Sequence, residues 1–308
     1  MARTDLTFSI VVPTYNEEAD IRRTCEALVG LKYPRKEVII VDGASTDNTV
    51  AIVDEYVQSH GFKLLHEARR RGVSAARNEG IRYASGEVVV ILNADVFPRD
   101  DFLERIAKHY ANGAQYVCVD SQIVNTDHLF PRFIQANHQY HFGGEKPVGW
   151  TEGFSCCRES AVAAGLFPEA IPGAGGEDVV FFDRLRQLDC KGVVDKSIVV
   201  HHVMPETFRG FWGQWKGRGY AVPFLRRYVL GVPLGFLFAN RLAASLYSLL
   251  GIVTVVPLVL KVAALCKHSK LGYRDSIPFL VVEVVCITAH RYGEWRGMIE
   301  VFAREKRK

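Results

Sequence analysis

Short apolar runs alternate with stretches whose apolar positions recur at helical spacing over roughly the first 120 residues. The apolar runs include FSIVVPT, EVIIVD and EVVVIL, and they are nearly continuous rather than alternating. Strands of this kind, separated by helices, predict a mostly parallel sheet covered by helices on both faces. We therefore expect an α/β domain in this part of the chain.

Polar residues follow three of the predicted strands, at 13–18, 42–47 and 93–95. Ligands of parallel α/β sheets bind at the carboxyl ends of the strands, so these segments are candidate ligand contacts. Asp42 has two interpretations. It accepts hydrogen bonds from a nucleobase or a ribose, or it serves an Asx turn within its own loop.

The segment Asn93-Ala94-Asp95 follows the fourth predicted strand. A carboxylate there can hold Mg²⁺ or Mn²⁺ against a diphosphate, since both ions prefer oxygen ligands. The alternative is a helix cap for DFLERIAKHY, but Asp100 is better placed to cap that helix. Asp95 is then available for a ligand.

A second pair of acids, Glu177 and Asp178, follows two glycines and begins a predicted helix. Acids in a first helical turn suit the helix dipole, and a carboxylate there could equally remove a proton from an attacking hydroxyl. His201 and His202 end a later predicted strand. Either is a candidate metal or phosphate ligand, although surface histidines are the commoner case.

Aromatic and basic residues mix in residues 206–228, FRGFWGQWKGRGYAVPFLRR being most of that segment. They fit a belt at a membrane interface, or a cationic clamp on a leaving diphosphate with Gln214 and Arg218 turned inward. The chain beyond is apolar, and 242–260 is a run of 19 residues without a charge. About 20 apolar residues cross a bilayer core as a helix.

Residues 229–308 are therefore predicted to attach the chain to a membrane. Helices at about 235–262 and 276–292 are the expected crossings, with both ends cytosolic. Helices lying flat in the interface and a buried hairpin of a soluble protein are the alternatives. Basic residues flank every segment, so the positive-inside rule selects no topology.

The composition narrows the classes further. The net charge of +4 in 308 residues gives no support to a nucleic-acid partner. Seven cysteines without a CxxC motif indicate reduced thiols facing the cytosol, with no disulfide frame or zinc site. The N-terminal residues enter a strand directly and do not predict a signal peptide.

Five motifs in order carry a family resemblance: SIVVPTYNEE, VIIVDGASTDNT, GVSAARNEGIRYASGEVVVILNAD, GLFPEAIPGAGGEDVVFFDRL and QWKGRG. Over residues 7–220 the chain resembles the inverting family 2 glycosyltransferases, whose GT-A fold is Rossmann-like. A catalytic domain followed by membrane helices is also similar to polyprenyl-phosphate sugar transferases and to a minimal cellulose synthase.

The resemblance implies a role for each matching residue. Asp178 would be the general base beside Glu177, and Asp95 would hold the metal, with His202 as a second candidate ligand. Gln214 and Arg218 stand where processive members carry QxxRW; here the arginine comes one residue later and no tryptophan follows it, which argues against processive polymerisation. The residues expected to bind the donor are Pro13, Tyr15, Glu17, Asp42, Arg77, Asn93, Ala94 and Asp95.

The predicted organisation is a catalytic domain at 1–225 and a membrane-attachment region at 229–308, at the cell membrane with the catalytic domain facing the cytoplasm. The predicted activity is inverting, metal-dependent transfer from a GDP- or UDP-sugar, GDP-mannose being favoured, to a lipid-linked acceptor. A catalytically silent nucleotide-sugar-binding scaffold is the main alternative. A dinucleotide-dependent oxidoreductase is disfavoured, because no GxGxxG follows the first strand.

Overall fold

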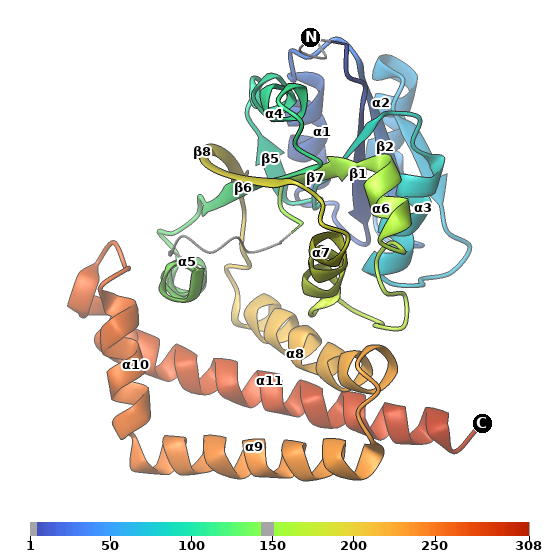
Figure 1. The fold of residues 1–308 in the computed structure, drawn as a ribbon. Helices are drawn as coiled ribbons and strands as arrows, with labels where there is room; N and C mark the ends of the chain where they lie inside the picture. Colours follow the sequence, from blue (N-terminus) through green and yellow to red (C-terminus); the bar gives the residue numbers. More distant parts are fainter. Residues whose placement is uncertain (1–4, 143–150, 308) are drawn as a thin grey trace. The chain divides into compact units, whose positions relative to one another are not determined.

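The computed structural model describes residues 5–142 and 151–307, which divide into two compact units. Unit 1 comprises residues 1–122, 147–169 and 177–202, and unit 2 comprises 123–146, 170–176 and 203–308. Figure 1 shows the strands gathered in the first part of the chain and long helices in the last part.

The sheet has eight strands in the order β3-β2-β1-β4-β7-β6-β8-β5. The first four strands of the chain pair in parallel, as the apolar runs predict, and a helix precedes each of the last three. β4 with β7, β6 with β7, and β5 with β8 pair antiparallel, so the sheet is mixed rather than mostly parallel. The strands are β1 (Phe8–Thr14), β2 (Lys36–Asp42), β3 (Lys63–His66), β4 (Val88–Ile91), β5 (Val96–Pro98), β6 (Tyr116–Ile123), β7 (Phe154–Cys157) and β8 (Gly192–His202).

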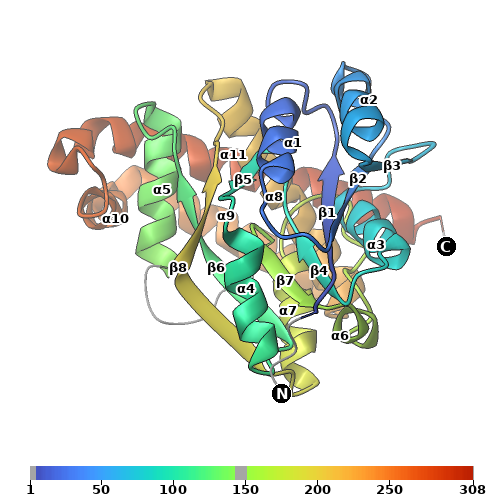
Figure 2. The ribbon, with the colours of Figure 1, turned by 90° about the horizontal axis from the view of Figure 1, so that it is seen from above.

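Helices cover both faces of the sheet, as expected from strands that are apolar throughout. Ile10 and Val12 of β1 pack in one buried cluster with residues of α1 and α4, whereas Val11 between them packs in a second cluster with α3 and α7. Figure 2 shows α1 and α3 on opposite sides of β1. The helices of unit 1 are α1 (Ile21–Val29), α2 (Thr49–His60), α3 (Val73–Tyr83), α4 (Phe102–Ala111), α6 (Arg158–Ala163) and α7 (Glu177–Gln187).

The predicted cap of α4 is wrong. The N-cap residue is Asp101, whose side chain makes no capping hydrogen bond. Asp100 instead forms an ion pair with Lys32, with Nζ and Oδ2 2.6 Å apart. Lys32 is distant in sequence but carries a full positive charge. It therefore competes with the backbone N–H groups of the helix for the Asp100 carboxylate.

Unit 2 consists of helices that pack around α11. Figure 1 shows α11 running between α8 and α9, with α10 and the short η2 joining α9 to α11. Phe133, Phe211 and Phe279 are fully buried in the core that α5, α8, α10 and α11 share. The helices are α5 (Leu129–Phe142), α8 (Phe208–Phe224), η1 (Leu225–Val229), α9 (Leu234–Thr254), α10 (Val256–Cys266), η2 (Gly272–Asp275) and α11 (Ser276–Glu305).

One helix in the described ranges, α9, is long and apolar enough to cross a membrane. The first predicted crossing is divided in the structure, because α9 ends at Thr254 and α10 begins at Val256. The second lies within α11, which carries the buried acids Glu283 and Glu294.

Glycines allow α8 and α11 to pack backbone against backbone. A methyl group at Gly219 would overlap the carbonyl oxygen of His290. At Gly293 and Gly297 it would overlap the carbonyl oxygens of Lys216 and Tyr220. The contact therefore depends on the absence of a side chain at three positions on two helices.

Replacing Gly297 with leucine is expected to lower the free energy of unfolding by about 3 kcal/mol, because the side chain would separate the two backbones. The matched control is Gly213→Ala on α8, where an added methyl group meets nothing within 4 Å. This control should gain roughly 0.5–1 kcal/mol from helix propensity. Urea unfolding followed by circular dichroism measures both, and equal stability of Gly297→Leu and the parent would contradict the packing argument.

Candidate active site

Two loops at the carboxyl ends of β1 and β2 are joined by hydrogen bonds. The backbone N–H of Asn16 donates to the Ser45 hydroxyl at 2.9 Å, and the Thr46 N–H donates to the Asn16 side chain at 2.8 Å. The N–H of Glu17 donates to the hydroxyl of Thr49 at 2.8 Å. These bonds hold the segment after Pro13 against the segment after Asp42, the two places where the sequence predicts ligand contacts.

Asp42 is fully buried and has local partners. Its Oδ2 accepts from the backbone N–H of Ser45 at 3.0 Å and lies 2.9 Å from Nδ1 of His66. The hydroxyl of Thr14 donates to its Oδ1 at the long distance of 3.4 Å. The structure therefore gives Asp42 the turn-forming role, while Oδ1 retains capacity to accept a stronger bond.

Tyr15 pairs with an arginine that the motifs do not single out. The guanidinium carbon of Arg70 lies 3.8 Å from the centre of the Tyr15 ring, so the cation lies over the ring face. Arg70 is exposed and belongs to the run Arg69 to Arg71 between β3 and α3. The three consecutive arginines after a strand were the signal available in the sequence.

Arg77 on α3 connects three segments inside unit 1 and is itself buried. Its Nη1 donates to Oε1 of Glu177 at 2.9 Å. Its Nη2 donates to Oδ1 of Asn93 at 3.1 Å and to the hydroxyl of Thr151 at 2.8 Å. Arg77 therefore joins the loop after β4 to the start of α7, and the neutral Asn93 serves as an acceptor beside an existing ion pair.

Replacing Arg77 with methionine is expected to cost about 3–5 kcal/mol of unfolding free energy, because it leaves the Glu177 carboxylate buried without this partner. Arg82→Met, on the same helix but paired with Glu169 at an exposed position, should change stability by less than about 1 kcal/mol. The double variant Arg77→Met with Glu177→Gln should recover part of the loss. Denaturant melts measure these effects, and an Arg77→Met protein as stable as the Arg82→Met protein would refute the assignment.

Asp95 lies beside a buried histidine because of a strand pairing that the sequence did not predict. A turn closed by the Val96 N–H and the Asn93 carbonyl reverses the chain into β5, where Val96 is paired in register with His202 of β8. Nε2 of His202 is then 3.1 Å from Oδ2 of Asp95, and Nδ1 is 3.2 Å from Oε1 of Glu152.

Both ring nitrogens of His202 thus face carboxylates. Burial lowers the pKa of His202, but the charges of Asp95 and Glu152 outweigh this and hold the pKa well above its ordinary value. The arrangement suits an imidazolium that orients Asp95. To act as the predicted metal ligand, Nε2 would have to leave that carboxylate.

Acidic residues at this edge favour a cation. Burial, together with the negative charges of Asp95, Asp20 and Asp47, raises the pKa of Glu17 to about 8, although His202 opposes them. The field that holds a proton on Glu17 also attracts a divalent ion. The carboxyl group of Asp95 is 30% exposed and suits an ion that takes its other ligands from substrate phosphates and water. Within residues 5–142 and 151–307, no three candidate ligand side chains converge as a metal cage would require.

Ala94 contributes through its backbone rather than its side chain. Its carbonyl oxygen accepts a hydrogen bond from the hydroxyl of Thr24 on α1, and both residues are buried. This bond fixes the loop that carries Asn93 and Asp95.

Asp178 stands in the first turn of α7, next to Glu177. Its side chain is half-buried, and its Oδ1 accepts from the Val179 N–H at 2.8 Å. Burial and the charge of Glu177 raise the pKa of Asp178 to about 7, although Arg77 opposes them. A carboxylate with a pKa near neutrality is suited to accept a proton in catalysis.

Gln214 and Arg218 belong to α8 in unit 2. The Gln214 side-chain nitrogen donates to the sulfur of Met204 at 3.5 Å, while its Oε1 is buried with no hydrogen-bond partner. The guanidinium of Arg218 lies 5.0 Å from the centre of the Trp215 ring. Gly175 packs against the backbone of Arg218, so the glycines before Glu177 allow close contact with α8.

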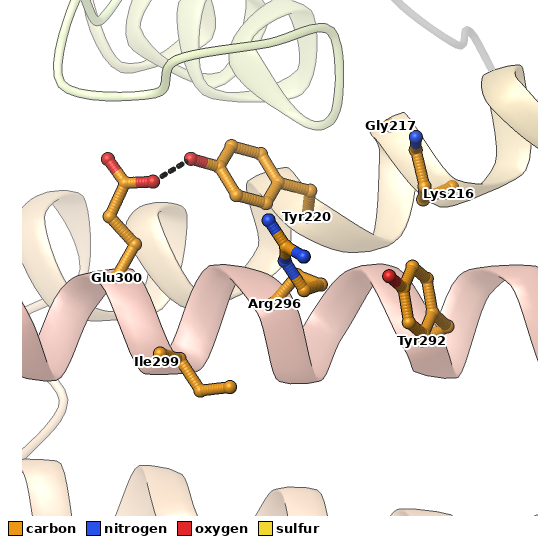
Figure 3. Close-up of a pocket in the computed structure, with 7 residues that line it drawn as sticks. All are labelled: Lys216, Gly217, Tyr220, Tyr292, Arg296, Ile299 and Glu300. Atoms are coloured by element: carbon orange, nitrogen blue, oxygen red, sulfur yellow. Dashed lines mark hydrogen bonds between the residues drawn. The ribbon is translucent and has the colours of Figure 1, made fainter.

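Unit 2 also contains a cavity of about 640 Å³ between α8 and α11. Figure 3 shows Tyr220 of α8 hydrogen-bonded to Glu300 of α11, with Arg296 beside the tyrosine. Lys216 and Arg296 are exposed and line this cavity from the two helices. It is lined by Lys216, Gly217, Tyr220, Tyr292, Arg296, Ile299 and Glu300.

The structure thus places eleven of the thirteen predicted site residues in unit 1. Nine lie at or near the carboxyl ends of β1, β2 and β4 or at the start of α7, while Arg77 lies within α3 and His202 ends β8. The eleven are Pro13, Tyr15, Glu17, Asp42, Arg77, Asn93, Ala94, Asp95, Glu177, Asp178 and His202. Three residues of this region, Arg70, Glu152 and Thr151, are not among those predicted from the sequence. The last two follow a Gly-rich segment and carry no motif, so only their contacts identify them.

Comparison with known proteins places these features in context. Residues 9–167 match the model of glycosyl transferase family 2. The poly-beta-1,6-N-acetyl-D-glucosamine synthase of Staphylococcus epidermidis is 28% identical over 239 residues, which cover 70% of this chain and 55% of the synthase. The chain therefore spans about half the length of that relative.

Two further proteins are similar to this chain: a sequence relative named for a lipid-linked substrate, and a solved structure of similar fold. The dolichyl N-acetyl-alpha-D-glucosaminyl phosphate 3-beta-D-2,3-diacetamido-2,3-dideoxy-beta-D-glucuronosyltransferase of Methanococcus voltae is 36% identical over 107 residues, 33% of each chain. The structure of the mannosyltransferase PcManGT from Pyrobaculum calidifontis, in complex with GDP-Man and Mn²⁺, is similar with a TM-score of 0.64 and 21% identity. The match covers 96% of this chain and 88% of that one, and it confirms the GT-A fold.

Proposed function

The chain belongs to glycosyl transferase family 2, and from this premise we propose that it transfers a hexose, with inversion, from a nucleotide sugar to a lipid-linked acceptor. Asp178 is the general base in this proposal, and Asp95 holds a divalent metal. The nucleotide binds at the carboxyl ends of β1, β2 and β4, near Tyr15, Glu17 and Asp42.

The observation that carries the proposal is the hydrogen-bonding position of Arg77. It ties the loop of Asn93 and Asp95 to Glu177, the residue before Asp178. A base and a metal-binding carboxylate that act on one donor sugar must be held in a constant geometry. A buried arginine bonded to both segments supplies that constraint, and the amide oxygen of Asn93 is its acceptor in the loop.

The proposed reaction depends on two charged groups, a divalent metal ion and the carboxylate of Asp178. A divalent metal, when bound, would neutralise charge that develops on the leaving diphosphate. Asp178 removes the proton from the acceptor hydroxyl, whose oxygen attacks the anomeric carbon on the face opposite the leaving group. His202 and Glu152 keep Asp95 oriented, and the anomeric configuration inverts because one displacement occurs. No carboxylate nucleophile is needed, unlike a retaining glycosidase.

The donor in this proposal is GDP-mannose. The support is the mannosyltransferase whose structure contains GDP-Man and Mn²⁺, which is similar along nearly the whole chain. A UDP-sugar is the competing donor, and the motifs are compatible with both. The metal is Mn²⁺ or Mg²⁺, since Asp95 offers a hard oxygen ligand.

The acceptor is a lipid that carries a phosphate or a glycan. A relative named for a dolichyl phosphate sugar and the one candidate membrane helix among the described residues both suggest membrane association. We assign the cavity between α8 and α11 to the acceptor phosphate, because Lys216 and Arg296 present cations there. The catalytic unit faces the cytoplasm in this proposal, where nucleotide sugars are made.

The test is transfer of radiolabelled sugar from GDP-mannose and from UDP-glucose to a lipid extract, with Mn²⁺ or Mg²⁺. The expected result is metal-dependent transfer from GDP-mannose, with the KM for the acceptor raised about 10-fold in Arg296→Ala. Transfer from the UDP-sugar alone would reject the donor assignment. Metal-dependent binding of the nucleotide without transfer to any acceptor would instead favour the catalytically silent scaffold.

A further inference from the structure

The outer face of α9 is an apolar surface within unit 2, and exposed apolar residues continue onto α10. Leu246, Leu250 and Val253 are between 58% and 70% exposed, which is unusual for such side chains in a helix packed on its neighbours. Only 11% of the most apolar 18-residue stretch of α9 is buried. The large apolar residues exposed on these helices are Phe236, Phe238, Leu242, Leu246, Tyr247, Leu249, Leu250, Val253, Val256, Val259 and Leu260.

The inner face of α9 carries three polar residues, Arg241, Ser245 and Ser248, beside the fully buried Leu237. It is therefore more polar than the outer face, the reverse of a helix on a water-soluble protein. Arg241 is buried and forms an ion pair with Glu294 of α11. The hydroxyl of Ser248 accepts from Nε of Arg291 at 3.0 Å. The hydroxyl of Ser245 accepts from the indole N–H of Trp295, also at 3.0 Å.

These contacts show that α9 and α11 are antiparallel neighbours over most of α9. Phe238 meets Phe302 with ring centres 6.4 Å apart, and three turns further along α9 Ser248 meets Arg291. Figure 1 shows the two helices side by side. A crossing by α9 would therefore take α11 into the bilayer with it.

That arrangement is unfavourable for α11. Arg296 is exposed on this helix and Glu300 is partly exposed, and Gly293 and Gly297 hold α8 against it backbone to backbone. Charged side chains at the centre of a bilayer are costly, and α8 adds Lys216 to them. Crossing is thus disfavoured by the helices to which α9 is fixed, although its own length and composition allow it.

We propose that α9 lies flat in one leaflet of an anionic lipid bilayer, with its outer apolar face among the acyl chains and α10 rising from its end toward the head groups (Figure 1). Cations near this surface complement acidic head groups: Arg226 precedes α9, and the exposed Lys267 and Arg274 follow α10. Arg227 is not counted among them, because it pairs with Glu305 at 2.7 Å. The unit then docks on the membrane from one side. The in-plane α9 replaces the first crossing expected from hydropathy, and α11, which contains the second, stays out of the bilayer core.

Depth measurements along α9 test this arrangement. Ala239, Leu246 and Val253 are all exposed and lie two turns apart, about 10 Å each along the helix axis. Each is replaced by a cysteine carrying a fluorophore, in vesicles of phosphatidylcholine and phosphatidylglycerol containing brominated lipids. The chain without an added cysteine is the control, because any fluorophore that it takes up must be attached to its native cysteines. Flat helices give the same depth at all three positions, whereas a spanning helix gives depths that differ by the spacing of the residues.

Vesicle flotation gives an independent measurement with a matched control. Replacing Leu246 and Leu250 with glutamate should reduce the bound fraction at least 10-fold, whereas Val162→Glu, at an equally exposed valine of α6, should leave it unchanged. Unequal depths along α9 would overturn the proposal. So would a chain that ignores vesicles and instead forms dimers broken by the Leu246 and Leu250 substitutions, since a second copy would then cover the face.

Discussion

Replacing Asp178 with asparagine is expected to reduce kcat by about 10³-fold, because a base in this role contributes roughly 10²–10⁴ to the rate. The amide cannot accept the proton of the acceptor hydroxyl, while the size of the side chain is unchanged. The KM for the nucleotide sugar should change little, since the proposed role of Asp178 is in the transfer step rather than in donor binding. Single-turnover transfer of radiolabelled sugar separates binding from chemistry.

The pH dependence follows from the raised pKa of Asp178, about 7. The base is active when deprotonated, so kcat/KM should rise with pH through about 7 and level off above it. The folded protein binds a proton here at pH values where the unfolded chain, with an ordinary aspartate, does not. The contribution of Asp178 to the free energy of unfolding therefore falls as pH rises from about 4 to 7.

Asp178→Asn should for that reason be slightly more stable than the parent at pH 8, by about 1 kcal/mol. An inactive but more stable variant is the signature of a strained catalytic carboxylate. The control is Asp183→Asn on the same helix, where the aspartate is 55% exposed and near Arg186. If Asp178→Asn keeps parental turnover, or if the Asp183 variant loses as much, Asp178 is not the base.

Replacing Asp95 with asparagine should have a comparable effect, a loss of transfer of about 10²–10³-fold, because Asp95 in the proposed mechanism would hold a metal that stabilises charge on the leaving diphosphate. Removal of divalent metal with EDTA should reduce sugar transfer by the parent enzyme to a similar extent. The variant should also need a higher Mn²⁺ concentration for half-maximal rate. Activity measured across a Mn²⁺ titration checks both effects.

Asp100→Asn provides the matched control five residues away. Asp100 is 48% exposed and pairs with Lys32, so its loss should change the rate by less than about 2-fold. A metal titration of Asp95→Asn that overlays the parent curve would remove Asp95 from the metal site.

Asn93→Asp bears on the same loop. The new carboxylate would face Arg77, which already pairs with Glu177. Arg77 would neutralise much of the added charge, so transfer should be retained. This differs from the simple expectation that a second acid beside Asp95 must become a metal ligand.

Much of the catalytic unit can be predicted from local sequence. Continuous apolar runs separated by helical repeats indicate β1 to β4 and their parallel pairing, because a parallel neighbour requires an intervening crossover. The polar segments after those runs identify Asp42 and Asp95, because strands that run parallel end at one edge. These inferences need only residue spacing, which is a property of the chain itself.

The partners of those residues depend on tertiary structure. His202 meets Asp95 because β5 pairs antiparallel with β8, and Arg77 meets Glu177 across 100 positions of sequence. The same holds for α9, whose composition indicates a crossing while its contacts with α11 favour a flat position. Sequence by itself determined which residues carry charge and which strands are buried. Only the fold decided which charges pair, because a buried charge requires a partner and that partner can come from anywhere in the chain.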